Sequence, residues 1–277
     1  MENRDRLLAH KLTPIIGAEI DGVDLSRPLD ETIKKEIRAA LLEHLVLFFR
    51  GQNLSCEQQK ALGRSFGKLH RHPAPLNSLG GDPEVLVIHT DADSTRIAGE
   101  DWHSDVSCDI EPPLASILHL SEIPPTGGDT LFASMYAAYE GLSDALQRFV
   151  SDLTAIHDGA RNYAGRSLAR RGEEGYPSAE HSVVRTHPET GRKALFVNRL
   201  FTTRIVQLKP NESSKILEML FEHASRPEFQ CRFRWSPGAV ALWDNRCTQH
   251  IAVWDYYPAR RYGHRVTIAG DRPFFKP

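Results

Sequence analysis

The chain has 277 residues, and its 34 Lys and Arg side chains nearly balance its 36 Asp and Glu side chains, which gives a formal net charge of −2 at pH 7. This balance argues against a nucleic-acid partner, because phosphate contacts supply most of the affinity of nucleic-acid-binding proteins. The longest apolar stretch, residues 45–49, is far shorter than the roughly 20 residues that cross a bilayer, and residues 1–8 lack the apolar segment of a signal peptide, so we expect a soluble, cytoplasmic protein with no membrane partner.

The first half of the chain mixes strand-like and helix-like segments. Short apolar runs predict strands at residues 15–20, 45–49 and 85–88. Asp30 and Ser55 are suitable N-caps for two helices. The inward faces of these helices would carry Ile33, Ile37, Leu41, Leu62 and Phe66. The helix that follows Asp30 has no visible chemistry.

The second half predicts many short strands bounded by glycine, proline and asparagine. These strands cover residues 114–120, 183–186, 194–197, 229–235, 239–243 and 265–269. Two helices, at about 134–150 and 212–224, would pack outside them. Short strands without regular βα alternation favour an antiparallel sandwich or jelly-roll barrel over a doubly wound sheet. We therefore predict one domain over residues 1–277 with an α+β fold, an antiparallel sandwich or jelly-roll core and flanking helices.

A long polar segment interrupts this pattern at residues 158–180. It contains several glycines and charged residues, and long loops of this kind often cover an active site. We predict a lid here, and the alternative is a surface loop without a functional role.

Histidines are unusually frequent, with 13 in the chain. A jelly roll with many histidines suggests the facial triad of two histidines and one carboxylate, in which an H-x-[DE] segment supplies two ligands and a distant histidine the third. The pattern occurs at residues 89–91, 103–105 and 187–189. The third match contains Pro188 and is followed by Gly191, which predicts a turn. The residues themselves leave the choice between His89 and His103 open.

The C-terminal region adds His250 and two arginines, Arg261 and Arg265, which follow it by 11 and 15 positions. Residues four apart can face one cavity in either a strand or a helix. A guanidinium binds a carboxylate or sulfonate through two hydrogen bonds, so this pair suits anionic ligands. The alternative is an arginine-rich strand on the surface.

Four segments, in unbroken order, resemble the taurine dioxygenase (TauD/TfdA) family. They are WHSDV at 102–106, PPTGGDT at 124–130, LFVN with FTTRI at 195–205, and the region from WDNR at 243–246 through His250 to Arg265. The likeness extends from about residue 15 to residue 274. It favours His103 over His89 as the first metal ligand.

The resemblance implies an enzyme that uses iron(II), 2-oxoglutarate and O2 on a double-stranded β-helix (jelly-roll) core. His103, Asp105 and His250 match the metal ligands of the family. Thr130 and Arg261 match the residues that hold the distal carboxylate of 2-oxoglutarate. The cosubstrate would be converted to succinate and CO2 while the organic substrate is hydroxylated.

The resemblance also implies an anionic substrate. His72, the main-chain N–H of Val106 and Arg265 match the residues that hold the sulfonate in taurine enzymes, and Phe201 would form an apolar wall. Pro75 and Gly99 stand where those enzymes hold the amine, which argues against taurine itself, while the residues that hold the anion are kept. The expected substrate is therefore a taurine-like sulfonate or an alkyl sulfate ester, which would yield an aldehyde with sulfite or sulfate.

Several alternatives remain open at this stage. The same cofactors could act on an aryloxyalkanoate or a biosynthetic intermediate. A zinc hydrolase could use the same three ligands, and a non-catalytic jelly-roll module could bind anions. Cys108, where the family often places phenylalanine, is interpreted as a small hydrophobic residue. Homo-oligomerisation is expected from the family.

Overall fold

The computed structural model describes residues 7–72, 81–164 and 175–277. Within these ranges the strands are β1 (Leu8–Lys11), β2 (Ala18–Asp21), β3 (Val46–Phe49), β4 (Val85–Thr90), β5 (Ala115–Glu122), β6 (Thr130–Ser134), β7 (Thr154–Asp158), β8 (Ser178–Ser182), β9 (Val184–Thr186), β10 (Lys193–Leu195), β11 (Thr202–Ile205), β12 (Gln230–Phe233), β13 (Ala239–Asp244), β14 (Thr248–Ala252) and β15 (Arg261–Ile268). The helices are α1 (Glu31–His44), α2 (Cys56–Arg64), α3 (Met135–Glu140), α4 (Asp144–Ser151), α5 (Ala160–Tyr163) and α6 (Pro210–Ala224), with a 3-10 turn at Pro227–Phe229. None of these helices is both long and apolar enough to cross a membrane.

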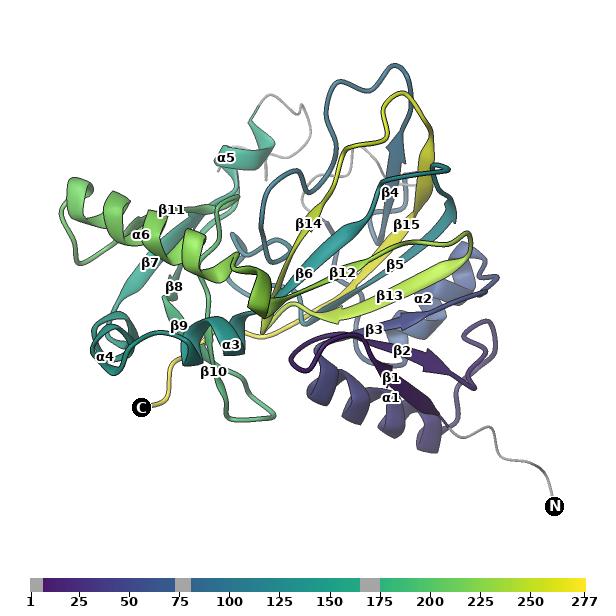
Figure 1. Cartoon of the computed structure of the whole chain (residues 1–277), viewed down its shortest axis with the longest axis horizontal. Coiled ribbons are helices and arrows are strands. Elements are labelled where there is room, and N and C mark those ends of the chain that lie inside the picture. The colour runs from purple at the N-terminus through teal and green to yellow at the C-terminus, as the bar shows by residue number, and fades with distance from the viewer. Residues whose placement is uncertain (1–6, 73–80, 165–174) are drawn as a thin grey trace.

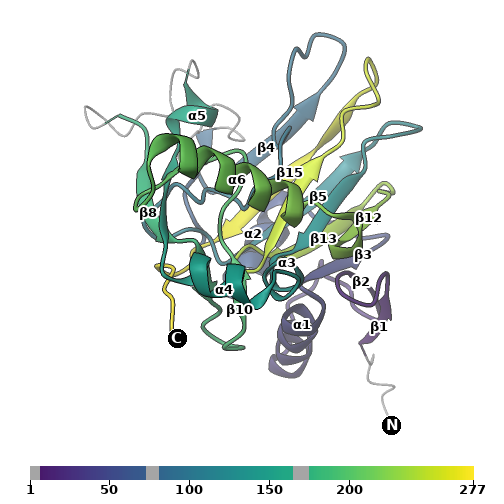
Figure 2. The ribbon, with the colours of Figure 1, turned by 60° about the vertical axis from the view of Figure 1, so that its left-hand side comes forward.

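Most of these strands form two sheets that face each other (Figure 1). The larger sheet has the order β1-β2-β3-β13-β5-β15-β4, and the smaller one has the order β12-β6-β14. The pairing is antiparallel between all described neighbours except β2 and β3, which run parallel. A further sheet, β11-β7-β8, and the β9-β10 hairpin lie to one side, where α6 packs along β11 (Figure 2). The structure therefore combines α-helices with mostly antiparallel sheets.

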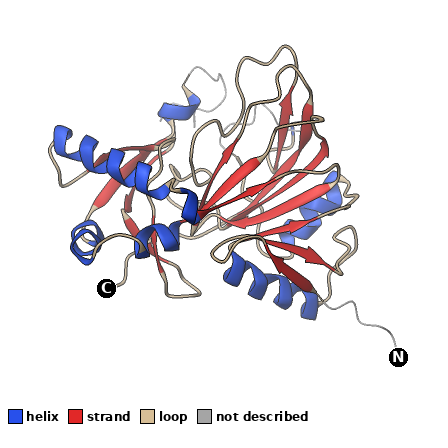
Figure 3. Cartoon of the chain, in the orientation of Figure 1, coloured by secondary structure: helices blue, strands red, loops and turns tan. Residues whose placement is uncertain are grey.

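The core has two layers because side chains alternate along the buried strands. In β3, Leu47 and Phe49 pack with Ile37 of α1, while Phe48 points into the space between the two sheets. There the Phe48 ring stacks on Phe233 of β12 with centroids 3.9 Å apart. Figure 3 shows α1 and α2 outside the larger sheet, where they cover its second face.

The two predicted N-caps of the first half are confirmed. The Asp30 carboxylate accepts a hydrogen bond from the Ile33 N–H at 2.8 Å, and Ser55 forms a capping box with Gln58. Phe66 packs against the core as predicted, but it lies just beyond the second helix, because α2 ends at Arg64.

The single helix predicted at 134–150 is also wrong. The structure has two helices, α3 and α4, separated at residues 141–143. Gly141 is the C-cap of α3, and the Ser143 hydroxyl accepts from the Leu146 N–H at the start of α4. A glycine followed by a serine N-cap ends one helix and begins another.

The apolar pattern of the sequence does not predict the strands β6 and β14. Thr130 and Ser134 lie in β6, and Thr248, Gln249 and His250 lie in β14. Polar side chains are buried at these positions, so the apolar runs that predict strands are absent.

The predicted lid at 158–180 is described only at its two ends. The N-terminal end forms α5, and the Gly159 N–H donates to the Pro177 carbonyl at 2.8 Å, which brings the ends together. Residues 165–174 lie outside the described residues, so the lid stays a prediction. The single domain over residues 1–277 also stays a prediction.

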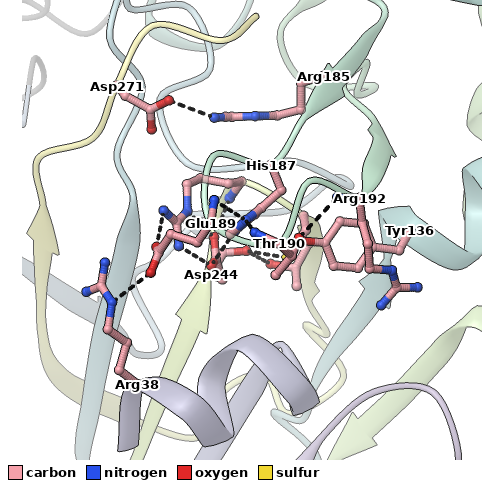
Figure 4. A network of polar contacts seen from close by, with 12 residues as sticks. Arg38, Tyr136, Arg185, His187, Glu189, Thr190, Arg192, Asp244 and Asp271 are labelled. Carbon is pink, nitrogen blue, oxygen red and sulfur yellow. Dashed lines mark hydrogen bonds and ion pairs between the residues drawn. The ribbon is translucent and has the colours of Figure 1, made fainter. Parts of the chain in front are cut away.

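A buried ionic network fixes the turn between β13 and β14 (Figure 4). The Arg246 guanidinium binds both carboxylate oxygens of Asp244, at 2.9 and 2.6 Å, and its third nitrogen contacts Glu189 at 2.7 Å. Glu189 also accepts from Arg38 of α1 at 2.8 Å. His187 accepts two backbone N–H groups on Nδ1, so its Nε2 carries the proton and donates to Asp244 at 3.1 Å.

We predict that Arg246→Met lowers the free energy of unfolding by about 3 kcal/mol, because it leaves the buried Asp244 carboxylate without its main counter-charge. Urea unfolding at neutral pH measures this change. Arg27→Met is the matched control, since the Arg27 side chain is 81% exposed beside Asp24 and such surface pairs contribute at most about 1 kcal/mol. Equal losses in the two variants would contradict the prediction.

Candidate functional site

Two histidines and one aspartate meet between the two sheets. Ligand atoms of His103, Asp105 and His250 all lie within 4.8 Å of one another, and the three residues are buried. His250 is in β14, and His103 lies in the loop that precedes β5. A reciprocal pair of backbone hydrogen bonds joins them, with the His103 N–H donating to the His250 carbonyl at 3.1 Å and the reverse at 2.8 Å.

The donor atoms are oriented for a cation. The Nδ1 of His103 lies 2.8 Å from the Asp101 carbonyl, so it donates, and in the neutral ring Nε2 is the nitrogen with a free lone pair. This Nε2 lies 3.6 Å from Asp105 Oδ1. The Nδ1 of His250 is buried and has no hydrogen-bond partner in the structure. A buried polar atom without a partner is costly, which is consistent with a ligand that binds at this point.

The charges at this centre also suit a metal. Burial alone would raise the pKa of Asp105, but the Arg265 guanidinium and the neighbouring histidines hold it well below its usual value. Arg265 Nη1 lies 2.5 Å from Asp105 Oδ1. Burial, followed by the effect of His103, lowers the pKa of His250 well below its usual value. The group therefore offers one carboxylate and neutral imidazole, a donor set that fits iron(II).

The two arginines of β15 lie on the same side of the strand. Arg261 and Arg265 are 4% and 7% exposed, while the residues between them alternate in burial. Burial lowers the pKa of Arg261, and its Nε has no hydrogen-bond partner in the structure. The Thr130 hydroxyl of β6 accepts from Trp235 Nε1 at 3.0 Å, so its own hydrogen can donate to a ligand. Arg261 and Thr130 line one recess with His250.

A cavity of about 280 Å³ opens beside the donor cluster and adjoins that recess. Its lining includes His72, Val106, Phe201, Asp105 and Arg265. The predicted site residues therefore line two adjoining spaces. The apolar part of the lining also contains Leu86, Ile88, Ile97, Ala98 and Leu200. The space can hold a small anion with an apolar tail.

Val106 has an unusual backbone conformation, with φ of 47°. A β-branched residue rarely adopts a positive φ, because its side chain clashes with the backbone, and such strain often marks a functional position. Val106 is fully buried against Phe201 and Cys108. The left-handed turn follows Asp105 directly and sets the direction of the Val106 N–H.

Gly99 lies directly beside a ligand of the cluster. Its φ is 78°, and a Cβ added there would lie 3.0 Å from Cε1 of His103. A side chain at this position would press on the ring and strain the backbone. Pro75, the other residue that departs from the family pattern, lies outside the described residues.

The remaining sequence candidates lie elsewhere or have other partners. His89 contacts Asp91 at 3.3 Å with a side chain that is 40% exposed, and it does not join the donor cluster. The segment 187–189 forms the predicted turn. His187 belongs to a second group of possible ligands with Asp244 and Cys247, but its protonated Nε2 already donates to Asp244.

Sequence reasoning missed three residues of the site. Tyr163 of α5 lines the cavity, with its ring 6.1 Å from His72 and 5.8 Å from Phe201. Asn245 and Ser116 bind Asp105. The WDNR segment contained Asn245, but no sequence signal pointed to Ser116. Cys108 is buried between Tyr163 and Phe201, consistent with its interpretation as a small hydrophobic residue.

Comparisons with known proteins show the family of this chain. The family model described as "Taurine catabolism dioxygenase TauD, TfdA family" matches residues 8–267. The chain is 38% identical to an "Alkylsulfatase" of Acinetobacter baylyi, over 96% of this chain and 86% of that protein. It is 37% identical to an "Alpha-ketoglutarate-dependent sulfate ester dioxygenase" of Pseudomonas putida, over 95% and 90% of the two chains. A crystal structure of a taurine dioxygenase from Burkholderia xenovorans superposes with a TM-score of 0.85 at 40% identity and covers 97% and 91% of the two chains.

A layer of buried histidines supports the segment that follows Asp105. His157 Nδ1 lies 2.9 Å from the Ser107 hydroxyl, and His181 Nε2 lies 2.9 Å from the Asp109 carbonyl. Burial lowers the pKa of His181 to about 4 and lowers that of His157 well below its usual value. Both side chains are therefore neutral at pH 7.

We predict that the protein loses stability on acidification before its carboxylates titrate. A histidine whose pKa is lowered in the folded state stabilises the fold fully above pH 6.5, which is its ordinary pKa. This stabilisation is lost progressively as the pH falls toward the pKa of the folded state, about 4. For His181 the loss amounts to about 3 kcal/mol.

Urea unfolding between pH 7.5 and pH 4.5 measures this loss. His181→Gln keeps an N–H donor for the Asp109 carbonyl but cannot titrate, so its stability should fall less over the same range. An identical fall in the wild type and the variant would contradict the assignment to His181.

Proposed function

The chain belongs to the TauD/TfdA family of dioxygenases, and from this premise we propose that it oxidises a small organic sulfate ester or sulfonate that carries no amine. It is an iron(II)- and 2-oxoglutarate-dependent dioxygenase, an oxidoreductase that consumes O2. Its core is proposed to be the double-stranded β-helix, formed by the larger sheet and the facing sheet of β12, β6 and β14.

His103, Asp105 and His250 are the proposed iron ligands. The support comes from their shared centre, the lowered pKa of Asp105 and the unpartnered Nδ1 of His250. Bound iron(II) supplies, with 2-oxoglutarate and O2, the oxidising power that replaces a C–H bond of the substrate by C–OH. The chain's own contribution is to place the reactants and to keep water away from them.

Arg261 and Thr130 are proposed to hold the distal carboxylate of 2-oxoglutarate. The single observation that carries the assignment is the buried Arg261 guanidinium, whose Nε has no hydrogen-bond partner in the structure. A buried cation without a hydrogen-bonded counter-charge requires an anionic ligand. The Thr130 hydroxyl, already an acceptor for Trp235, can donate to the same carboxylate.

The sulfate or sulfonate group is proposed to bind Arg265, His72 and the main-chain N–H of Val106. These residues line the larger cavity together with Asp105, so an anion held there would lie next to the iron ligands. The strained backbone of Val106 fixes the direction of its N–H before the substrate arrives. Phe201, with its ring 6.4 Å from that of His103, is the proposed apolar wall.

The substrate tail is proposed to be apolar. Asp105, which already binds Arg265, supplies the carboxylate of the described lining, and Gly99 offers no side chain at all. A buried ammonium would have no further counter-charge among these residues, and burying it alone is costly. The relatives named as an alkylsulfatase and a sulfate ester dioxygenase support the same class of substrate.

The proposed reaction uses both oxygen atoms of O2. One oxygen atom of O2 enters succinate as 2-oxoglutarate loses CO2, and the other becomes the hydroxyl on the carbon next to the anionic group. The hydroxylated sulfate ester then collapses to an aldehyde and hydrogen sulfate, and a hydroxylated sulfonate collapses to an aldehyde and hydrogen sulfite. The collapse breaks the C–O or C–S bond, and the hydroxyl proton is transferred to the departing anion.

We predict that Arg261→Met raises the KM for 2-oxoglutarate roughly 10- to 100-fold, the range expected from the loss of hydrogen bonds between charged groups. Succinate formation at varied 2-oxoglutarate measures this change. Arg260→Met is the matched control, because Arg260 precedes Arg261 but is 55% exposed beside Glu122. An unchanged KM for 2-oxoglutarate in Arg261→Met would contradict the assignment of Arg261 to the distal carboxylate.

The chemistry of the substrate tail should determine which anions are turned over. Taurine and propane-1-sulfonate differ by an ammonium group in place of a methyl group. We expect propane-1-sulfonate, and alkyl sulfates such as butyl sulfate, to give a kcat/KM at least about 100-fold higher than taurine, because the described lining offers the ammonium no carboxylate other than Asp105, which is paired with Arg265. Succinate and aldehyde release across this panel measures the difference. Preferential turnover of taurine or phenoxyacetate would overturn the proposed substrate class.

A further inference from the structure

A chain of hydrogen bonds behind the metal site reaches one oxygen of Asp105. It begins in the turn between β13 and β14, at Asn245, and passes through Ser116 of β5. Asn245 belongs to the WDNR segment, for which the proposed function gives no role. Asn245, Ser116 and Asp105 are between 0% and 2% exposed, so water does not compete for their hydrogen bonds.

The donor and acceptor groups determine the direction of every hydrogen bond in this series. One side-chain atom of Asn245 accepts from Trp243 Nε1 at 2.9 Å and from the Asp105 N–H at 3.3 Å. Both partners can only donate, so this atom is the amide oxygen. The amide nitrogen of Asn245 therefore faces Ser116 Oγ at 2.9 Å and donates to it. The single hydrogen of Ser116 is then directed to Asp105 Oδ2, at 2.7 Å.

The two oxygens of Asp105 consequently have different surroundings. Oδ2 accepts the Ser116 hydroxyl from the protein side. Oδ1 lies 3.6 Å from His103 Nε2 and 2.5 Å from Arg265 Nη1, on the side of the shared centre. Rotation of the carboxylate out of this orientation would leave the Ser116 hydroxyl hydrogen, which the Asn245 amide directs toward Asp105, without its acceptor.

We propose that Asn245 and Ser116 are positioning residues that fix the rotation of the Asp105 carboxylate, so that Oδ1 alone binds the metal. A metal held by one oxygen of Asp105 and one nitrogen of each histidine would keep the coordination positions that 2-oxoglutarate and O2 need. If Asp105 bound through both oxygens, it would occupy one of them. This inference rests on the proposed metal ligands and assigns the WDNR segment a function in the site.

The test compares metal binding by Ser116→Ala and by a matched control, Ser104→Ala. Both serines are buried within 12 positions of Asp105, but the Ser104 hydroxyl donates to the Thr248 carbonyl at 2.7 Å and not to a ligand side chain. Metal-free protein is titrated with Mn(II) to obtain Kd, and its Co(II) complex is examined by visible absorption. Thermal unfolding of each metal-free variant reports the fold.

For Ser116→Ala we expect a Kd at least about tenfold higher, as for other residues that orient a metal ligand, and a changed Co(II) spectrum. Ser104→Ala should stay within about twofold of the wild type, with an unchanged spectrum. Ser116→Thr keeps the hydroxyl and should restore both the Kd and the spectrum.

Equal Kd values and spectra for Ser116→Ala and Ser104→Ala would overturn the inference, and so would a folded Ser116→Thr that binds as weakly as Ser116→Ala. The proposed function is tested separately by the wild type and His103→Ala. If the wild type binds Mn(II) and His103→Ala does not, the ligand assignment stands whatever the serine variants do. If the wild type binds no metal, the proposed function itself fails.

Discussion

The site depends on one pair of reciprocal backbone hydrogen bonds, between His103 and His250. The two histidines are 147 positions apart, and neither lies in the larger sheet. Pairing their backbones as an isolated antiparallel bridge brings the imidazole rings to a centroid distance of 4.1 Å. These hydrogen bonds use only backbone groups. The imidazole rings of His103 and His250 therefore remain available for a metal.

The surrounding structure holds each end of this bridge. On the β14 side, the buried ionic network of Asp244, Arg246, His187 and Glu189 fixes the preceding turn, and Arg38 connects it to α1. On the His103 side, His157 and His181 support the residues that follow Asp105. Both groups of residues are polar and buried. Each holds its part of the site in place only while its ion pairs are formed and its histidines keep the protonation state that their hydrogen bonds require.

The two arginines of β15 place positive charge in both spaces of the site. Arg261 and Arg265 line the recess with Thr130 and His250 and also the larger cavity, and Arg265 binds Asp105. Their separation by four positions in one strand gives both the same orientation but different neighbours. A chain whose formal net charge is only −2 can thus concentrate positive charge where a dicarboxylate and a small anion would lie.

The sequence by itself determined the helix caps at Asp30 and Ser55, the mostly antiparallel pairing and, through the family motifs, the residues that line the site. These features depend on local patterns or on motifs of fixed spacing. Tertiary structure alone decided between His89 and His103 on physical grounds, because only the folded chain places His103 against His250. It also revealed the contacts of Ser116 and Tyr163 at the site, and showed that His103 leaves little room for a side chain at position 99. Such contacts join distant segments, and no periodicity along the chain records which buried polar side chains will meet.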